Sequence, residues 1–318
     1  MVWPADPAGQ TIVSYEQRRC MARSSKGHLP TNAGFAMVLI APAIILLSLF
    51  TIAPAIYALI LSLQQKKISG GLFGGQTTMV FVGAANYLAT LADRQFWSSV
   101  WRMLTVAAIG VPATVILALL FALCLDAARA RLVGVWRILI FLPYAVPGVI
   151  ASLLWGFLYL PGTSPIGGKH VHYLVGNTVY FSVANVAVWA VVGFNMIIMY
   201  TTLRGLPKDM YEAARIDGAN ELQIALRVKV PMIRPAIVMC SMFSMLGALQ
   251  LFNEPMTLQP LSNAITTTWV PLMKVYNDAF VNNNVSGAAA TSLVLVALTI
   301  AVSLVVSGIG ALVRGKDE

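Results

Sequence analysis

The sequence predicts an all-α integral membrane protein with six transmembrane helices and both termini in the cytoplasm. Of the 318 residues, 58% are apolar and only 10% are charged, whereas a soluble domain carries about 25% charged residues. Several long stretches contain no Asp, Glu, Lys or Arg, and each can hold the roughly 20 residues that a spanning helix needs. The basic residues cluster in alternate connecting segments, which is typical of a chain that crosses a membrane repeatedly.

The uncharged stretches define the elements in order, because a charge at the centre of a bilayer is costly. We expect helices near 33–63, 99–125, 136–160, 179–203, 232–253 and 286–312. The segment 255–273 is also uncharged, but its three prolines and its run of three threonines predict a loop. Residues 33–313 therefore form the predicted transmembrane domain, and 1–32 form a basic cytoplasmic tail.

The orientation follows from the Lys and Arg residues, which stay on the cytoplasmic side. With the N-terminus inside, fifteen of the 21 Lys and Arg residues face the cytoplasm. This asymmetry explains the net charge of +9 without a nucleic-acid partner. The first apolar run is too long for a cleaved signal peptide, so we expect it to remain as the first helix.

The sequence gives no sign of catalysis or of a metal site. The three cysteines, Cys20, Cys124 and Cys240, have no metal-ligand spacing and are interpreted as packing residues. The segment 162–169 resembles a phosphate-binding loop only superficially, because Gly168 stands where a lysine is required. It is interpreted as a turn.

The cytoplasmic segment 205–231, here called the elbow, carries the strongest signal. Pro207 and Asp209 suit the start of a helix, and Gly218 suits the position after its end that needs positive φ. A second short helix is expected from Asn220, and Pro231 is expected to open the fifth spanning helix. The chain thus leaves the membrane, turns along its surface and returns.

Two interpretations of the elbow are open on physical grounds. It could be an ordinary charged loop with amphipathic helices in the headgroup region. Alternatively, Ala213, Ala214 and Gly218 leave one face nearly bare, which suits close approach of another protein.

A sequence pattern favours the second interpretation. Glu212-Ala213-Ala214, then Gly218, then 228–231 (Val-Lys-Val-Pro) resembles the EAA loop of binding-protein-dependent ABC importer permeases, whose pattern is E-A-A, three residues, G, nine residues, I-x-L-P. Asp217 before Gly218 is typical of the carbohydrate-uptake (MalF/MalG- and UgpA-like) branch. Further resemblance lies in 81–87, 142–147 and 252–255. Ala225 departs from the pattern, because this branch often has Phe there.

The resemblance implies a non-catalytic permease subunit in a bacterial or archaeal cytoplasmic membrane. Its implied partners are a second, MalG-like permease, two ABC ATPase subunits, an extracytoplasmic solute-binding protein and membrane lipid. No cofactor is expected on this chain, since ATP and Mg would bind the ATPases. The residues implied to couple the chain to the ATPase are Tyr211, Glu212, Ala213, Ala214, Asp217 and Gly218.

The implied substrate is a sugar that passes near mid-membrane, at the interface with the second permease. Aromatic rings stack on sugar faces, and amides bond to hydroxyl groups. The candidate residues for the substrate path are Tyr144, Trp155, Trp189, Gly193, Asn195, Tyr200, Gln250, Asn253 and Glu254. Such residues also occur in membrane helices for packing alone.

Other functions compete with sugar import. Glycerol-phosphate or another polyol derivative is an alternative substrate within the same branch. No Lys or Arg lies deep in the second to sixth helices to neutralise a phosphate, which favours a neutral sugar. An ion-coupled secondary transporter normally has an ionisable residue deep in a helix, and Glu254 is the only candidate. A membrane-embedded enzyme is disfavoured because no reactive constellation is present.

Overall fold

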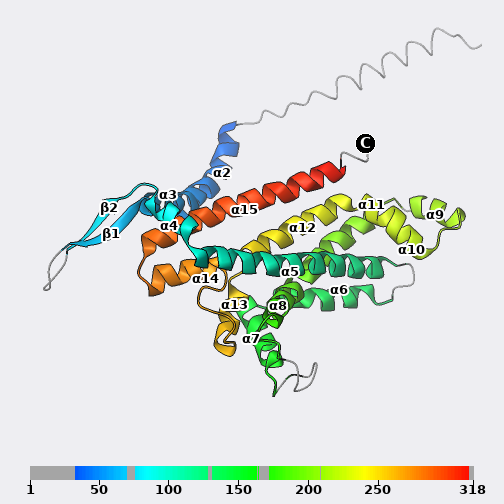
Figure 1. The fold of residues 1–318 in the computed structure, drawn as a ribbon. Helices are drawn as coiled ribbons and strands as arrows, with labels where there is room; N and C mark the ends of the chain where they lie inside the picture. Colours follow the sequence, from blue (N-terminus) through cyan, green and yellow to red (C-terminus); the bar gives the residue numbers. More distant parts are fainter. Residues whose placement is uncertain are drawn as a thin grey trace, which may run out of the picture. The chain divides into compact units, whose positions relative to one another are not determined.

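A computed structural model describes residues 33–69, 76–127, 131–162, 164, 172–207 and 209–314 (Figure 1). The predicted tail at 1–32 and most of the predicted turn at 162–169 lie outside the described residues. The chain divides into two compact units, Met1–Tyr57 and Ala58–Glu318. The helical prediction is confirmed, but one β-hairpin is present as well, so the class is not strictly all-α.

The described part of the first unit is continuous apolar helix. It consists of α2 (Ala33–Leu47), the π-helical turn η1 (Ser48–Ile52) and the start of α3 (Ala53–Ser62), which continues into the second unit. The stretch Met37–Ser62 is long and apolar enough to span a membrane, and only 6% of its most apolar window is buried. An exposed apolar surface of this length is expected to face lipid.

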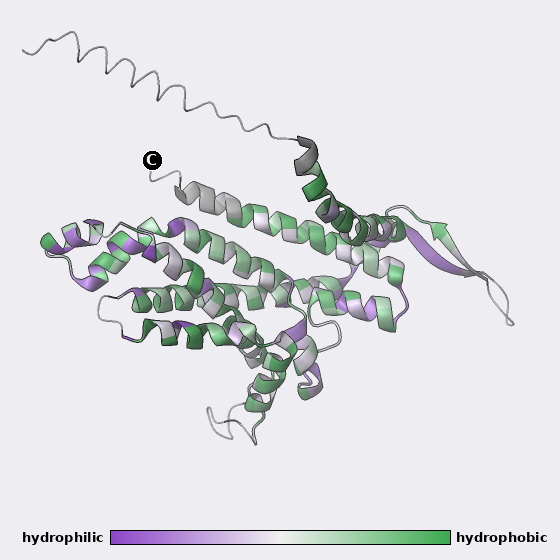
Figure 2. Cartoon of the chain, turned by 180° about the vertical axis from the view of Figure 1, so that it is seen from behind, coloured by the Kyte–Doolittle hydropathy of each residue, from purple (hydrophilic) through white to green (hydrophobic). Residues whose placement is uncertain are grey.

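The second unit contains three more helices that could span a membrane unbroken. These are α5 (Arg94–Asp126), α8 (Thr178–Arg204) and α15 (Val285–Arg314), and they agree with the predicted helices at 99–125, 179–203 and 286–312 to within a few residues. Figure 2 shows apolar colouring along most of their length. With the first unit, four helices of the described chain pass the length and composition test.

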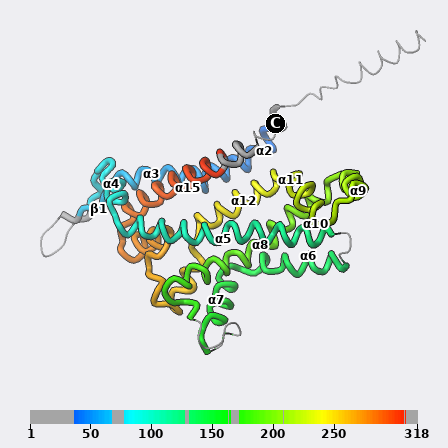
Figure 3. The backbone as a smooth tube through the Cα atoms, turned by 45° about the vertical axis from the view of Figure 1, so that its right-hand side comes forward, coloured from blue at the N-terminus to red at the C-terminus, as the bar shows by residue number. Residues whose placement is uncertain are grey.

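The other two predicted spans are bent helix pairs. The first joins α6 (Val133–Phe141) and the 3₁₀ turn η2 (Leu142–Ala145) to α7 (Gly148–Tyr159) with a bend of 97°. Pro143 and Pro147 explain this break, because proline cannot donate a backbone hydrogen bond to the preceding turn. Figure 3 shows α7 turning away from α6. The described chain thus has four candidate spans, or up to six if each pair counts as one.

The second bent pair corrects the expected start of the fifth helix. The helical segment of α10 (Glu221–Ile224), the π-helical turn η4 (Ala225–Lys229) and α11 (Val230–Met232) continues through Pro231. The chain then bends by 71°, and α12 (Arg234–Leu249) begins. Pro231 therefore ends the elbow instead of opening the spanning helix, and the early position of Pro235 in α12 suits a helix start.

Helices α5 and α8 form the centre of the second unit. Gly110 of α5 faces Ala184 of α8, so closely that a Cβ at Gly110 would lie 3.8 Å from the Ala184 methyl group. Two buried clusters flank this contact. One surrounds Phe96 and Trp269, and the other surrounds Met196 and Met199. Small residues permit such close approach of helices within a membrane.

The β-hairpin between the first two predicted spans was not predicted. It pairs β1 (Gln64–Ser69) with β2 (Gln76–Phe81) in antiparallel register, with Gln64 opposite Phe81. The following helix, α4 (Ala85–Ala92), holds the start of the hairpin in place. The Asn86 side-chain amide donates hydrogen bonds to the backbone carbonyls of Ser62 and Gln64, both at 2.8 Å. The polar composition of this segment gave no apolar alternation from which strands could be inferred.

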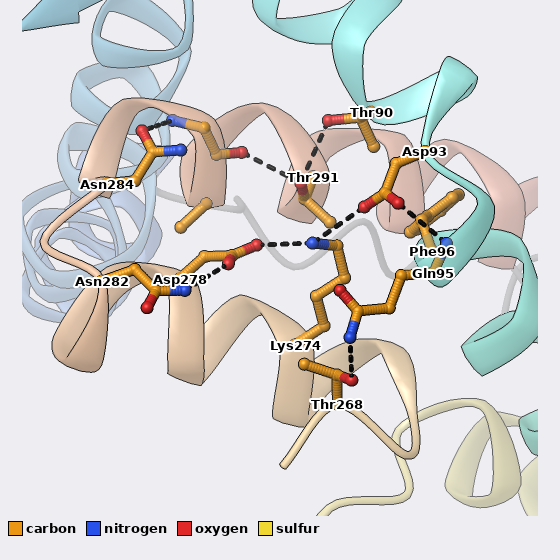
Figure 4. A network of polar contacts seen from close by, with 12 residues as sticks. Thr90, Asp93, Gln95, Phe96, Thr268, Lys274, Asp278, Asn282, Asn284 and Thr291 are labelled. Carbon is orange, nitrogen blue, oxygen red and sulfur yellow. Dashed lines mark hydrogen bonds and ion pairs between the residues drawn. The ribbon is translucent and has the colours of Figure 1, made fainter. Parts of the chain in front are cut away.

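The predicted loop at 255–273 and its continuation form short helices and no span. They are α13 (Asn253–Leu258), η5 (Gln259–Leu261), α14 (Pro271–Tyr276) and η6 (Asn277–Val281). Lys274 of α14 holds this segment in place through ion pairs with Asp93 at 3.0 Å and with Asp278 at 2.9 Å (Figure 4). Asp93 also caps the N-terminus of α5, so this polar network joins α14 to the start of α5.

Candidate functional site

A cavity of about 430 Å³ lies among the central helices of the second unit. We call it the central cavity. It is lined by four residues of α5, by Tyr144 of η2, by seven residues of α8 including Phe194 and Asn195, by four residues of α12 including Ser244, and by Leu251 and Glu254. Most of its lining is aliphatic or aromatic, as is usual for a small-molecule site.

One wall of the central cavity is an aromatic stack. The rings of Tyr144 and Phe194 lie 4.9 Å apart between centroids, with only 15° between their planes. Phe141 lies beside Tyr144 at 5.4 Å. The break at Pro143 and Pro147 places Tyr144 here, since it ends α6 and turns the chain away before α7 begins. The stack offers a flat apolar surface to a bound molecule.

The polar groups of the central cavity are few and partly unsatisfied. Asn195 is only 2% exposed, and its side-chain amide donates to Ser244 Oγ at 2.9 Å. Its Oδ1 atom is buried and has no hydrogen-bond partner among the described residues. An unsatisfied buried acceptor costs about 1 to 3 kcal/mol. A ligand hydroxyl group in the cavity could remove this cost by donating to Oδ1.

The structure brings three of the predicted substrate-path residues, Tyr144, Asn195 and Glu254, to the central cavity. Trp155 and Trp189 do not line it, and they contact each other edge to face at 6.0 Å instead. Tyr200 is buried in the core cluster with Met196 and Met199. Gln250 follows α12 as its exposed C-cap, and Asn253 is exposed at the start of α13.

Gly193 has a packing function that its sequence context did not reveal. A Cβ at this position would overlap the Ile140 carbonyl oxygen and lie 2.7 Å from Phe141 Cα. The glycine therefore allows the backbones of α8 and α6 to touch just behind the aromatic stack. This contact sets the distance between two walls of the central cavity.

The elbow forms the second part of the candidate site. The helix α9 (Asp209–Ile216) is followed two residues later by Gly218, whose φ of +84° confirms the predicted left-handed position. The backbone N–H of Ala219 donates to the Ala214 carbonyl at 2.9 Å and closes the turn. A capping box then starts α10, in which Asn220 and Gln223 bond reciprocally at 2.8 Å. These contacts satisfy backbone groups that a helix end leaves unpaired.

The residues implied for coupling lie mostly on the exposed side of the elbow. Glu212, Ala213, Asp217 and Gly218 are exposed, and Ala214 is half-buried. Large apolar side chains accompany them, with Ile216 exposed by 86% and Leu222 by 68%. These exposed side chains are available for contact with another surface.

Tyr211, the remaining predicted coupling residue, points inward. Lys229 Nζ lies 5.0 Å from the centroid of its ring, and its hydroxyl group is buried without a partner among the described residues. Lys229 is also paired with Asp126 at 2.6 Å. Burial raises the pKa of Tyr211, and the negative charge of Asp126 adds to this effect.

The sequence did not reveal Ser244, Asp126 or Lys229 as parts of these sites. Asp126 and Lys229 are separated by 103 positions in the chain. Asp126 appeared only as the charge that ends an apolar stretch, and Lys229 only as a basic residue within the 228–231 pattern. Neither signal specifies a partner. Ser244 carries no pattern of its own.

Comparisons with known proteins give a consistent result. Residues 82–315 match the sequence profile of the family described as "binding-protein-dependent transport system inner membrane component". The trehalose transport system permease protein SugA of Mycobacterium tuberculosis is 29% identical over 291 residues, covering 89% of this chain and 91% of that protein. The sn-glycerol-3-phosphate transport system permease protein UgpA of Salmonella typhimurium is 28% identical, covering 84% and 91%.

Solved structures show the same fold. A chain of a bacterial ABC transporter involved in the import of the acidic polysaccharide alginate superposes with a TM-score of 0.74 at 18% identity, covering 87% of this chain and 95% of that chain. A second structure, of a bacterial alginate ABC transporter in complex with a periplasmic protein that holds an alginate pentasaccharide, gives a TM-score of 0.68 at 20% identity and covers 86% and 92%.

Proposed function

The chain belongs to the family of binding-protein-dependent transport system inner membrane components, and we propose that it is the permease subunit that carries a neutral sugar through an ATP-driven importer. The sugar arrives on an extracytoplasmic solute-binding protein. It crosses the membrane at the interface with a second, similar permease. Two ATPase subunits supply the energy, and they hold the ATP and Mg. This chain carries out no chemistry.

The proposal includes a topology. Each bent helix pair counts as one span, which gives six spans, and residues 33–313 form the transmembrane domain of a multi-pass protein in the cytoplasmic membrane. The positive-inside distribution of Lys and Arg supports cytoplasmic termini and a cytoplasmic elbow. The exposed face of Glu212, Ala213 and Gly218 then meets the ATPase.

The single observation that carries the choice of a neutral sugar is the lining of the central cavity. It combines the Tyr144–Phe194 stack with the free Oδ1 acceptor of Asn195. Its described lining contains Glu254 and no Lys or Arg. A phosphate or an acidic sugar would meet a carboxyl group there and no compensating cation. This argues against the substrates named for the glycerol-phosphate and alginate systems.

Alternating access connects the two parts of the site. Transport requires that the ATPases bind differently to the two arrangements of the permease, because only a difference in contact free energy can shift the equilibrium between them. The elbow supplies contacts that can differ between these arrangements. The central cavity is the site whose accessibility from the two sides of the membrane changes between these arrangements.

The test is ATP turnover by the complex that purifies with this chain from its native membrane, in nanodiscs. Trehalose, maltose and glycerol 3-phosphate are added separately with the binding protein. We expect a neutral sugar to stimulate turnover and glycerol 3-phosphate to leave it unchanged. Stimulation by glycerol 3-phosphate would overturn the sugar assignment. Failure of any ATPase to purify with the chain would overturn the importer function.

A further inference from the structure

Helix α5 has a buried ion pair at the end that meets the elbow. Asp126 is its last residue, and Lys229 ends the π-helical turn η4. Lys229 Nζ donates to Asp126 Oδ2 at 2.6 Å, and the two side chains are only 7% and 8% exposed. We propose that Asp126 and Lys229 are positioning residues that make the elbow and α5 move as one body. This inference rests on the proposed importer function.

Burial makes this pair difficult to separate. Each ion that lost its partner would be left unpaired with its side chain more than nine-tenths buried, which is strongly destabilising. The other ion pair of the elbow, between Arg215 and Glu221, differs in this respect, because its side chains are 42% and 60% exposed. Exposed pairs contribute little to stability, because water screens their charges. The Asp126–Lys229 pair is therefore the strong link.

Tyr211 extends the link to the helix that carries the coupling motif. Its ring lies over Lys229, at 5.0 Å from Nζ, and it belongs to α9, one residue before Glu212. A small hollow of about 130 Å³ brings Asp126, Lys229 and Tyr211 together with Glu212. A displacement of α9 by a partner thus acts directly on the Lys229 side chain.

The turn η4 explains why Lys229 points toward α5. A π-helical turn contains one more residue per hydrogen-bonded ring than an α-helix, and here the Val230 N–H bonds to the Ala225 carbonyl. The neighbouring Leu226 and Arg227 are exposed, whereas Lys229 is buried. Isolated π turns frequently occur at functional sites.

Helix α5 then carries the displacement to the central cavity. The cavity residue Thr114 belongs to the same unbroken helix and precedes Asp126 by 12 positions, or roughly 18 Å along the axis. A rigid helix with one end fixed to the elbow moves this wall of the cavity when the elbow moves. The pair would therefore be needed for coupling even though it contacts neither sugar nor ATP.

The experiment measures ATP-driven access to the central cavity and needs no knowledge of the sugar. Cys20, Cys124 and Cys240 are replaced by alanine, and a single cysteine is introduced by Ala187→Cys in the cavity lining of α8. The complete complex in nanodiscs is treated with a membrane-impermeant maleimide, without nucleotide and with ATP plus vanadate. The response is the ratio of the two labelling rates.

The key variant is the double substitution Asp126→Leu/Lys229→Met. Replacing both ions of a buried pair by apolar groups of similar size is often neutral for stability, so this variant separates positioning from folding. We expect the parent response of about fivefold or more to fall to nearly one, while the ATPases stay bound and the melting temperature stays near the parent value. Asp126→Asn alone should lose both stability and response.

The other end of α5 provides a matched control. Lys274 is also a buried lysine, and it pairs with Asp93, the N-cap residue of the same helix (Figure 4). Lys274→Met should lower the melting temperature and preserve the labelling response. A loss of response in this control would show that any damage to α5 suffices, and would overturn the inference.

The remaining outcomes distinguish the inference from the function on which it rests. A double variant that responds like the parent protein would show that the pair only stabilises the fold, and the inference would be wrong. A parent complex without an ATPase or without any nucleotide response would overturn the proposed function, and the inference with it.

Discussion

Asn195 gives the central cavity a hydrogen-bonding group that the fold leaves half satisfied. Its amide is held by Ser244, so the free Oδ1 has a fixed position from which to accept a hydroxyl proton. We expect Asn195→Leu to raise the sugar concentration for half-maximal ATPase stimulation by up to about tenfold, the equivalent of one hydrogen bond. The measurement is a titration of the reconstituted complex with the stimulating sugar and its binding protein.

Asn185→Leu is the matched control on the same helix. Its amide donates to Tyr159 Oη at 2.9 Å, and it does not line the central cavity. The half-maximal concentration should therefore stay at the parent value. Equal effects of the two substitutions would show that Asn195 acts through helix packing and not through the sugar.

Gly193 provides a residue-level prediction about stability. Gly193→Ala forces the backbones of α8 and α6 apart, because the new methyl group meets the Ile140 carbonyl and Phe141 Cα. Overpacking of this kind costs about 1 to 3 kcal/mol, so the melting temperature in detergent should fall. Gly134→Ala on α6 meets nothing within 4 Å and should stabilise by about 0.5 to 1 kcal/mol through helix propensity. A Gly193→Ala protein as stable as the parent would contradict this close contact.

At the scale of elements, the elbow depends on the capping box that starts α10. Asn220→Ala removes the side-chain acceptor for the Gln223 N–H and should destabilise this turn by about 1 kcal/mol. We expect hydrogen-exchange protection in 221–229 to fall about fivefold. Asn220→Asp retains the acceptor and should keep the protection near its original level. If both variants exchange alike, the cap does not hold the elbow.

The elements show which features a sequence can predict. Long apolar stretches between charges predicted α5, α8 and α15 well, since composition alone decides whether a helix can lie in lipid. The breaks after Ala145 and Met232 were missed. Proline is tolerated in many membrane helices, and its presence in the sequence does not specify the angle of a bend. The hairpin was missed because polar strands lack alternation.

The sites could be predicted only in part, for a related reason. Gly218 was identified because a left-handed residue after a helix has a local signature. Tyr144 was a candidate by residue type, and Asn195 by residue type and by the family resemblance, but their convergence depends on how four segments pack. Trp155 and Trp189 have the same chemistry and lie elsewhere. Pairs such as Asp126 and Lys229 arise from tertiary structure and have no sequence signature.

At the scale of the whole molecule, the Lys274 network fastens segments far apart in the chain, and its charges should set a pH range of full stability. Burial raises the pKa of Asp93, but the Lys274 and Gln95 hydrogen bonds and the Lys274 charge lower it further, to below the ordinary 3.8. Burial lowers the pKa of Lys274, but its bonds to Asp278 and Asp93 raise it above the ordinary 10.5.

The sign of the pH dependence follows from these directions. The Asp93 contribution is present above its ordinary pKa of 3.8 and is lost as the pH falls through the lowered folded value. The Lys274 contribution is present below 10.5 and is lost as the pH rises through the raised folded value. The network therefore contributes its full stabilisation throughout the neutral range and fails only at either extreme.

Lys274→Met tests this range directly. At neutral pH the variant leaves Asp93 and Asp278 without their cation, at a cost of about 3 to 5 kcal/mol, so its melting temperature should lie well below that of the parent protein. As the pH falls toward 4, protonation of Asp93, whose burial is no longer offset by the Lys274 charge, relieves part of the penalty, and the gap between the two melting temperatures should narrow. Melting curves of both proteins between pH 4 and 9 make the measurement. A gap that stays constant over this range would mean that Lys274 stabilises the molecule by packing and not by charge.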